Sequence, residues 1–405
     1  MLVKIGMGVD VRTAAEQRIS WTFDRFPKIC VSFSAGKDSS VMLHMVCAEA
    51  RRRGVKVAVL LIDLEAQYKY TMDHAIACYE EYSDVIEPYW ISLPLVLRNA
   101  VSQFEPRWIC WDPDARSAWV REPPDFAITD GSEFPFYRHA MEFEEFVDGF
   151  AHWYAGGDAL ACFVGIRTQE SLNRYRTIAS DTKSTIEGAR WTTWKGGTVY
   201  NAYPIYDWQT EDVWRFVATT RCSYNKVYDA MHLAGLSIHQ ARICQPYGDD
   251  QRKGLWLFMV IEPETWAKVV ARVLGANTGA LYAHKSGSLF GRIKVSLPAG
   301  HTWESFSRLL LETMPPRNRD HFESKIAVFL QWYAVRGVNP IPDAGDDSMA
   351  ERFPRHGGPS WERVAKVLLK NDWWCKGLSF SQTKSDRYEK YLETIKQRRK
   401  RWGMI

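Results

Sequence analysis

The chain has 405 residues, of which 46% are hydrophobic, 25% charged and 14% aromatic, with 52 Lys and Arg against 48 Asp and Glu. This length allows roughly two to three domains, and the composition excludes global disorder, collagen-like repeats and low complexity. No apolar run reaches the roughly 18 residues that a membrane-spanning helix needs. Residues 1–10 also lack a basic segment followed by an apolar one, so we expect a soluble, cytoplasmic protein with no membrane partner.

Alternating strand-like and helix-like hydrophobic patterns cover the first half of the chain. In order, they predict a helix at 11–25, a strand at 29–33, a helix at 40–53, a strand at 55–62, a helix at 68–82, a strand at 84–91, a helix at 141–154, strands at 159–166 and 198–206, and a helix from 210. Such alternation with short turns is typical of an α/β fold with a doubly wound parallel sheet. Residues 92–140, with six prolines and three tryptophans, interrupt the pattern and are predicted to be a long irregular insertion.

The second half of the chain has a mostly helical pattern. Helices are predicted at 303–311, 319–334, 361–369 and 386–401, and residues 339–360 are interpreted as a linker or long loop. From Lys384 to Arg401 there are eight basic residues against three acidic ones. This basic C-terminal tail could contact a nucleic acid or a protein partner, or could be a solvated helix end. We expect one domain at 20–250, containing the 92–140 insertion, and a helical region at 251–405.

Eight widely spaced cysteines contain no C-x-x-C pair. This spacing argues against zinc ribbons, dithiol redox motifs and the usual iron–sulfur runs, and favours free, mostly buried thiols in a reducing compartment. One cluster of Cys and His residues, Cys222, His232, His239 and Cys244, has gaps that match no familiar zinc pattern. Cys244, in a turn bounded by proline and glycine, is the cysteine to test as a thiol nucleophile.

The segment Ser34-Ala35-Gly36-Lys37-Asp38-Ser39-Ser40 joins a predicted strand to a predicted helix. Its backbone N–H groups would lie at the positive end of the helix dipole, which is a site suited to phosphate. Gly36 would let the backbone approach an anion, and Lys37 would supply a cation. The segment is not a Walker A loop, because G-x-x-x-x-G-K-[ST] is absent. The alternative is an ordinary polar turn with a capping side chain.

This loop resembles the pyrophosphate-binding loop (PP-loop) of the adenine nucleotide α-hydrolase superfamily, and in particular its phosphoadenosine phosphosulfate (PAPS) reductase-like branch, which includes immunoglobulin-binding regulator A. Three downstream segments are similar to family motifs: Leu61 to Glu65, Gly165 to Arg174 with the pattern G-x-R-x-x-E-S-x-x-R, and Tyr203 to Trp214. The resemblance covers about residues 20–250. It implies an adenine nucleotide α-hydrolase-like fold with an adenine nucleotide as ligand.

The resemblance also implies roles for individual residues. The nucleotide would be bound by Ser34, Ala35, Gly36, Ser39, Ser40, Asp63, Gly165 and Glu170. The catalytic group would be Lys37, Asp38, Arg167 and Arg174, in which the cations neutralise phosphate charge and Asp38 places Mg²⁺. Glu170 would orient Arg167 or the metal.

The chain departs from PAPS reductases because it has no E-C-G-I-H-type motif with a catalytic cysteine and no cysteine pairs for a cluster. These departures favour ATP with Mg²⁺ over PAPS. The first functional hypothesis is cleavage of ATP at the α-phosphate, which adenylylates an acceptor and releases pyrophosphate. The second is a PAPS reductase-like enzyme. The third is a nucleotide-sensing regulator that binds DNA or a protein through the tail and the tryptophan-rich segments, whose tryptophans could alternatively serve as core packing.

Overall fold

The computed structural model describes residues 8–102, 105–180, 182–248, 254–273, 276, 297–298, 300–314, 316–353, 356–369 and 372–380. The chain forms two compact units. The first comprises Met1–Asn99 and Arg107–Leu281, and the second comprises Ala100–Pro106 and Tyr282–Ile405. The predicted helix at 386–401 and the basic tail lie outside the described residues.

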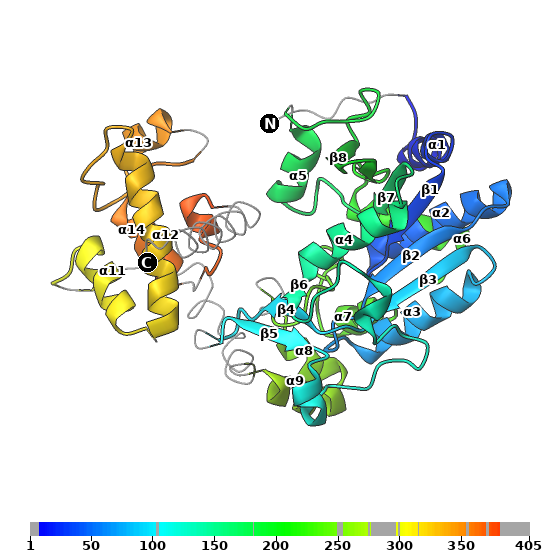
Figure 1. Ribbon diagram of the computed structural model, residues 1–405, viewed down its shortest axis with the longest axis horizontal. Coiled ribbons are helices and arrows are strands. Elements are labelled where there is room, and N and C mark those ends of the chain that lie inside the picture. The colour runs from blue at the N-terminus through cyan, green and yellow to red at the C-terminus, as the bar shows by residue number, and fades with distance from the viewer. Residues whose placement is uncertain are drawn as a thin grey trace, which may run out of the picture. The chain divides into compact units, whose positions relative to one another are not determined.

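The first unit contains a six-stranded sheet (Figure 1). Its strands, in spatial order, are β3 (Ile86–Ile91), β2 (Val57–Ile62), β1 (Lys28–Ser32), β7 (Leu160–Val164), β9 (Val199–Ala202) and β8 (Thr192–Gly196). All neighbours pair in parallel except β8, which runs antiparallel to β9 at the edge. The predicted doubly wound parallel sheet is therefore confirmed. The chain order reverses between β1 and β7, and ligands of such sheets bind at the carboxyl ends of the strands beside this point.

The helices of the first unit include those that pack against this sheet. They are α1 (Val11–Phe23), α2 (Lys37–Arg53), α3 (Lys69–Glu81), α4 (Phe143–Ala155), α5 (Leu172–Ala179), α6 (Thr210–Thr220), α7 (Val227–Leu233), α8 (Trp256–Ile261) and α9 (Pro263–Arg272). Helix α2 contacts α1, α6 and β1, whereas α4 contacts β7 and β9. Helix α2 ends at Gly54, whose left-handed backbone lets its N–H reach the carbonyl oxygens of Ala50 and Arg51. Residues 37–40 of the candidate loop form the first turn of α2.

The insertion at 92–140 is more regular than the sequence predicted. It contributes β4 (Leu95–Arg98) and β5 (Arg107–Cys110), which form a three-stranded sheet with β6 (Met141–Glu142), and the 3₁₀ turns η1 (Pro113–Ala118) and η2 (Gly131–Glu133). Pro94 and Pro106 immediately precede β4 and β5, positions where a missing N–H costs no ladder hydrogen bond. The prediction of an irregular segment was wrong because these strands are too short to show a period.

The second unit is helical, as predicted, with α11 (Trp303–Glu312), α12 (Pro316–Ala334), α13 (Asp347–Arg352), α14 (Trp361–Leu369) and the 3₁₀ turn η4 (Lys376–Leu378). Residues 339–360 are not a linker, because Ile341 is buried in the core of this unit. Asp343 also accepts hydrogen bonds from the N–H groups of Trp303 and Glu304 at the start of α11. In the described part of the chain, no helix is long and apolar enough to cross a membrane.

The buried tryptophans favour packing over base stacking. Trp108, Trp111, Trp373 and Trp374 are all buried, whereas Trp194 is exposed. The eight cysteines are all free, and all except Cys222 and Cys244 are buried, which confirms the predicted thiol state.

Two buried histidines connect α2 to its surroundings. His74 on α3 lies 2.8 Å from the Ser40 hydroxyl through Nε2, and His44 contacts the Tyr82 hydroxyl and the Ser223 carbonyl oxygen. Burial lowers the pKa of His74 to about 4 and also lowers the pKa of His44. An exposed histidine in the unfolded chain has a pKa of about 6.5.

We expect the free energy of unfolding to fall as the pH is lowered from about 6.5 to about 4. In this window the unfolded chain binds protons that the folded His74 and His44 do not, so acid favours the unfolded state. His74→Asn, which does not titrate, is expected to flatten this pH dependence in urea denaturation curves recorded at several pH values. An equally steep dependence in the variant would contradict this assignment.

Candidate functional site

The loop between β1 and α2 has an open, positively polarised backbone. Ala35 adopts a left-handed conformation with φ of 53°, and Gly36 forms the N-cap of α2 without a capping side chain. Within the loop, the N–H groups of Ser34, Lys37 and Ser40 donate hydrogen bonds to protein acceptors. Among the residues that the structure describes, the N–H groups of Ala35, Gly36, Asp38 and Ser39 have no acceptor. Four unpaired amides at a helix N-terminus form an anion site.

Two of the three predicted serine hydroxyls face this loop. The Ser34 and Ser39 hydroxyl oxygens are 3.0 Å apart, and Ser39 also lies 3.1 Å from the Gly36 carbonyl oxygen, to which it donates. The Ser40 hydroxyl contacts His74 instead, so its side chain takes part in helix packing.

The charged residues of the loop form a buried ion-pair network. Arg167, only 2% exposed, donates from Nε to Asp38 Oδ1 at 2.5 Å. Lys37 Nζ lies 3.5 Å from Asp38 Oδ2 and donates to the Ala241 carbonyl oxygen at 3.3 Å. The structure therefore brings Lys37, Asp38 and Arg167 together. In this arrangement Arg167 positions Asp38 in the first turn of α2.

Gly165 allows β7 to approach the loop closely. A Cβ atom at this position would lie 3.0 Å from the Asp38 carbonyl carbon and 3.1 Å from the Ser39 nitrogen. Any side chain would therefore push on the backbone that carries two of the open amides. This contact explains why a glycine follows directly after β7.

A second charged group lies next to the loop. Glu170 pairs with Arg174 and, at 2.9 Å, with Arg242. The Glu170 carboxylate does not pair with the Arg167 guanidinium as predicted, because that guanidinium pairs with Asp38; only the Glu170 backbone N–H bonds to the Arg167 carbonyl oxygen, at 3.2 Å. Arg242 was not among the predicted site residues, because it lies 72 residues from Glu170 in the chain and no local pattern connects the two.

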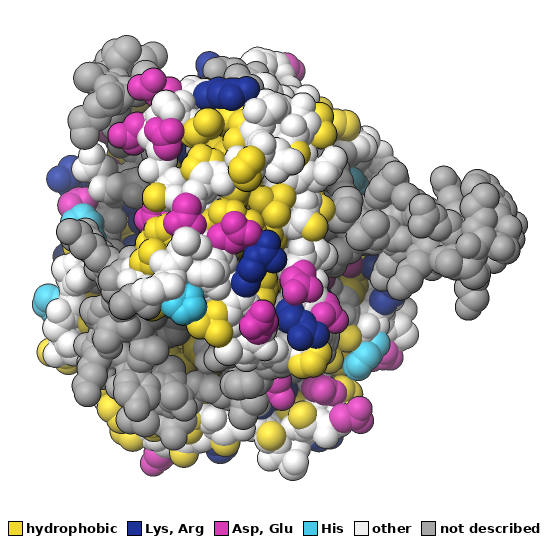
Figure 2. Space-filling model, turned by 90° about the vertical axis from the view of Figure 1, so that its left-hand side faces the viewer, with side chains coloured by type: hydrophobic (Ala, Val, Ile, Leu, Met, Phe, Trp, Pro, Cys, Tyr) yellow, Lys and Arg dark blue, Asp and Glu magenta, His cyan; other side chains and the backbone are white. Residues whose placement is uncertain are grey.

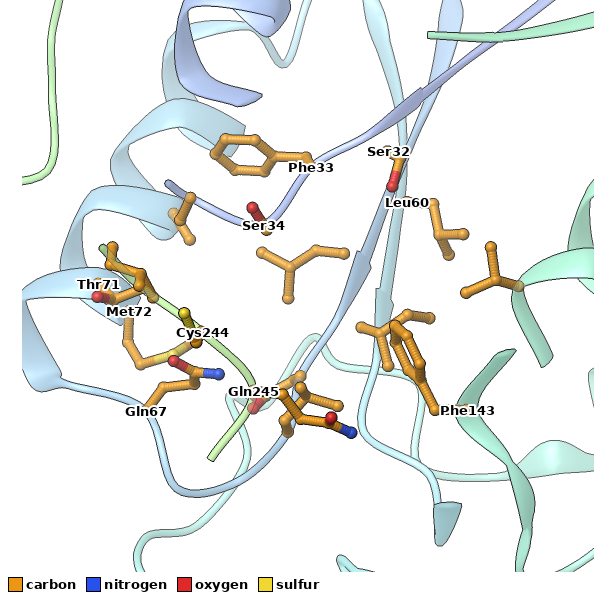
Figure 3. Close-up of a pocket in the computed structure, with 18 of the residues that line it drawn as sticks. Ser32, Phe33, Ser34, Leu60, Gln67, Thr71, Met72, Phe143, Cys244 and Gln245 are labelled. Atoms are coloured by element: carbon orange, nitrogen blue, oxygen red, sulfur yellow. The ribbon is translucent and has the colours of Figure 1, made fainter. Parts of the chain in front are cut away.

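A cavity of about 380 Å³ opens beside the loop at the carboxyl ends of β1 and β2 (Figure 3). Its walls include Ser34 and Ala35 of the loop, apolar residues of β2 such as Leu60, and the residues Glu170, Arg174, Arg242 and Cys244. Figure 3 shows the Cys244 sulfur directed toward the space between Ser34 and Gln67. The cavity thus joins an apolar wall to a charged rim.

Asp63 lines this cavity, but its polar atoms are all bound within the protein. Its side chain accepts from Trp90 Nε1 at 3.0 Å and pairs with Arg121, and its carbonyl oxygen accepts from Trp111 Nε1 at 2.6 Å. The backbone N–H donates to Ile91. Asp63 therefore shapes the cavity rather than presenting a free polar group.

Residues near 225–228 support the loop from a distant part of the chain. Asn225 Nδ2 donates to the Ala35 carbonyl oxygen and to Thr71 Oγ1, both at 3.0 Å. The Lys37 N–H donates to the Tyr228 hydroxyl oxygen at 2.9 Å. Neither residue belongs to a motif, so sequence reasoning missed both.

The residues around the loop do not match the predicted magnesium site. Both carboxylate oxygens of Asp38 are engaged by Arg167 and Lys37, so a metal ion there would have to displace two cations. In the described ranges, no group of three or more His, Cys, Asp or Glu side chains could hold a metal ion.

Comparisons with known proteins agree with this description. A family model for the phosphoadenosine phosphosulfate reductase domain matches residues 132–247, and one for a domain of unknown function (DUF3440) matches residues 235–352. The protein named "Uncharacterized protein YbdN" from Escherichia coli K12 is 43% identical over 408 residues, covering 100% of this chain and 98% of YbdN.

Two solved structures were also found. PAPS reductase from Candida auris, in a phosphate complex, is 12% identical with a TM-score of 0.31, covering 58% of this chain and 95% of that chain. FMN adenylyltransferase from Candida glabrata, in complex with ATP, is 15% identical with a TM-score of 0.31, covering 54% of this chain and 57% of that chain. The match therefore spans just over half the length of the adenylyltransferase.

Proposed function

Because this chain belongs to the same family as YbdN and contains a PAPS reductase-like domain, we propose that it binds ATP on residues 34–40 and cleaves it at the α-phosphate. The products would be pyrophosphate and either an adenylylated acceptor or, where water takes the place of the acceptor, AMP. The observation that carries this proposal is the set of four open amides at the start of α2, beside a cavity of about 380 Å³.

The charges around the loop support an anionic ligand. Lys37, Arg167, Arg174 and Arg242 supply four positive charges, and Asp38 and Glu170 supply two negative ones, which leaves a surplus of two positive charges. This surplus of positive charge would attract an anion, which would take the place of the carboxylates that now pair with the cations. The surplus fits phosphate groups better than a neutral ligand.

In this proposal each part of the site has a separate task. The open amides and Lys37 bind the β- and γ-phosphates and stabilise pyrophosphate as it leaves. Arg174 and Arg242, at the rim of the cavity, neutralise charge on the α-phosphate. Arg167 keeps Asp38 in place. Mg²⁺, which usually binds through substrate phosphates and keeps several waters, would arrive with the nucleotide.

Titration calorimetry with ATP and Mg²⁺, followed by a pyrophosphate assay on the same sample, tests this proposal. We expect ATP to bind and pyrophosphate to appear, and both to be lost when EDTA removes the metal. Binding of ATP without pyrophosphate release would contradict cleavage and would instead support a nucleotide sensor. Absence of any ATP binding would overturn the proposal.

One observation favours a second function. Cys244 lines the cavity beside Arg174 and Arg242, and a thiolate near positive charge is a suitable nucleophile. In a PAPS reductase-like reaction the Cys244 thiolate would take the sulfonate group from PAPS, and an added dithiol would release it as sulfite while being oxidised to a disulfide. This reaction would be detected as sulfite release from PAPS in the presence of the dithiol, with loss in Cys244→Ser. Binding of PAPS without sulfite release would count against it.

The face shown in Figure 2 has no continuous basic patch among the coloured residues, and its acidic and basic side chains are interspersed with hydrophobic ones. A phosphate backbone is usually bound by clustered Lys and Arg, so this face does not favour the regulator hypothesis.

A further inference from the structure

Tyr228 on α7 places its hydroxyl group against the loop between β1 and α2. Its side chain is buried, with 4% of the residue exposed, and its hydroxyl oxygen accepts a hydrogen bond from the Lys37 N–H at 2.9 Å. Lys37 is the first residue of α2. Tyr228 therefore contacts the N-terminus of α2, where the open amides of Asp38 and Ser39 also lie.

Three hydroxyl groups surround the point where Gly36 lacks a side chain. An atom in the position of a Gly36 Cβ would lie 3.4 Å from Ser34 Oγ, 3.6 Å from the Tyr228 hydroxyl oxygen and 3.9 Å from Ser39 Oγ. These distances are ordinary van der Waals contacts, so the space can accept an atom without a clash. Because Gly36 is the N-cap of α2, this point lies where an anion would approach the helix.

The hydroxyl protons of the two serines are used within the protein. Ser39 donates to the Gly36 carbonyl oxygen, and Ser34 can then donate to Ser39 at 3.0 Å. The Tyr228 hydroxyl oxygen already accepts from Lys37, and its own proton has no acceptor among the residues that the structure describes. A buried hydroxyl proton without a partner is unfavourable and calls for an acceptor.

Tyr228 is suited to act as a neutral donor. Burial raises the pKa of its phenol above the ordinary value, with a further contribution from the charge of Asp38. The hydroxyl group therefore stays protonated at neutral pH. The Lys37 N–H that points at its oxygen polarises the O–H bond and strengthens the hydrogen bond that it can donate.

We propose that the Tyr228 hydroxyl group donates a hydrogen bond to an oxygen of the pyrophosphate portion of the bound nucleotide. Tyr228 is then a ligand-binding residue supplied from outside the loop, and it adds a neutral donor to the amides and Lys37. This inference rests on the proposed nucleotide function. It narrows the ligand to one with a phosphate or pyrophosphate group seated over Gly36.

Tyr228→Phe tests this inference because it removes the hydroxyl oxygen and keeps the ring. We expect inorganic pyrophosphate and ATP to bind the variant about 10- to 100-fold more weakly, the loss typical of a hydrogen bond to a charged group. Adenosine, which has no phosphate, should bind equally to the variant and the wild type. All affinities are measured by calorimetry below the thermal transition of the variant.

Tyr224→Phe is the matched control. Its hydroxyl group bonds to Asp229 on the protein surface, and its removal should change pyrophosphate affinity less than about twofold. Equal affinities of Tyr228→Phe and wild type for pyrophosphate would overturn the inference and leave the proposed function intact. An equal loss for adenosine and ATP would also overturn it, because it would show a general structural effect. If the wild type bound neither pyrophosphate nor ATP, both proposals would fail.

Discussion

Replacement of Arg167 by alanine is expected to weaken ATP binding by about tenfold or more and to lower the free energy of unfolding by about 3–5 kcal/mol. Arg167 is 2% exposed and pairs with Asp38 in the first turn of α2. Without it, a mostly buried carboxylate would remain next to the open amides. This carboxylate would keep only Lys37, 3.5 Å away, as a counterion. The weaker pairing would destabilise the fold, and the carboxylate charge would repel the phosphates.

The double variant Arg167→Ala with Asp38→Asn separates these two effects. It removes both partners of the ion pair, so we expect much of the lost stability to return. It also restores the surplus of two positive charges, so ATP affinity should recover in part and stay below that of the wild type only by what the Arg167–Asp38 pair contributes to the geometry of the loop. Urea denaturation and calorimetry on the same preparations provide both numbers. Arg176→Ala, an exposed position on α5, serves as the control and should behave as the wild type.

Lys37→Ala is expected to show the same loss of ATP affinity, because the Lys37 side chain, 5% exposed, is a cation carried by the loop itself at the first residue of α2. Unchanged ATP affinity in both Lys37→Ala and Arg167→Ala would exclude the loop as the nucleotide site.

Glu65→Gln is expected to cause the largest loss of stability among substitutions outside the loop, about 3–5 kcal/mol. Glu65 is fully buried and binds Arg272 through both carboxylate oxygens, at 2.6 and 3.1 Å. It also accepts hydrogen bonds from the N–H groups of Trp111 and Val120. Loss of the charge would leave the buried Arg272 guanidinium without its counterion.

Urea denaturation followed by circular dichroism measures this loss. The double variant Glu65→Gln with Arg272→Met removes both charges and should regain part of the lost stability. Glu133→Gln, which changes an exposed carboxylate of the 92–140 insertion, should be close to the wild type. A loss below 1 kcal/mol in Glu65→Gln would show that the ion pair contributes little.

The sequence predicted the parts of the fold that local patterns determine. Strands β1 and β2 are nearly continuous apolar runs, and α2 has a clear stripe and a glycine stop, so these elements and the loop between them were predicted within a few residues. The pairing of β8 with β9 was not predicted, because the exposed pattern of Thr192–Gly196 lacks the apolar run of a central strand.

The site was only partly predictable for a physical reason. The loop residues are consecutive, and their positions follow from one strand and one helix. Asn225, Tyr228 and Arg242 follow all the strands of the sheet in the chain and contact the site only through tertiary interactions. Their roles depend on tertiary contacts that no short-range pattern contains. Ser40 was predicted to bind the nucleotide for the same reason: the contact of its hydroxyl group with His74 cannot be read from the sequence.

The separation between the loop and its supports has a consequence during protein synthesis. Asn225 contacts Ala35 across 190 residues, and Tyr228 contacts Lys37 across 191. At about 5–20 residues per second, a ribosome needs about 10–40 s to add that length of chain. During this time the nascent chain already carries the loop but lacks Tyr228 and Arg242, so the proposed nucleotide would bind the incomplete site more weakly than the finished one. Its stabilising effect would therefore be largest once the segment after α6 is in place.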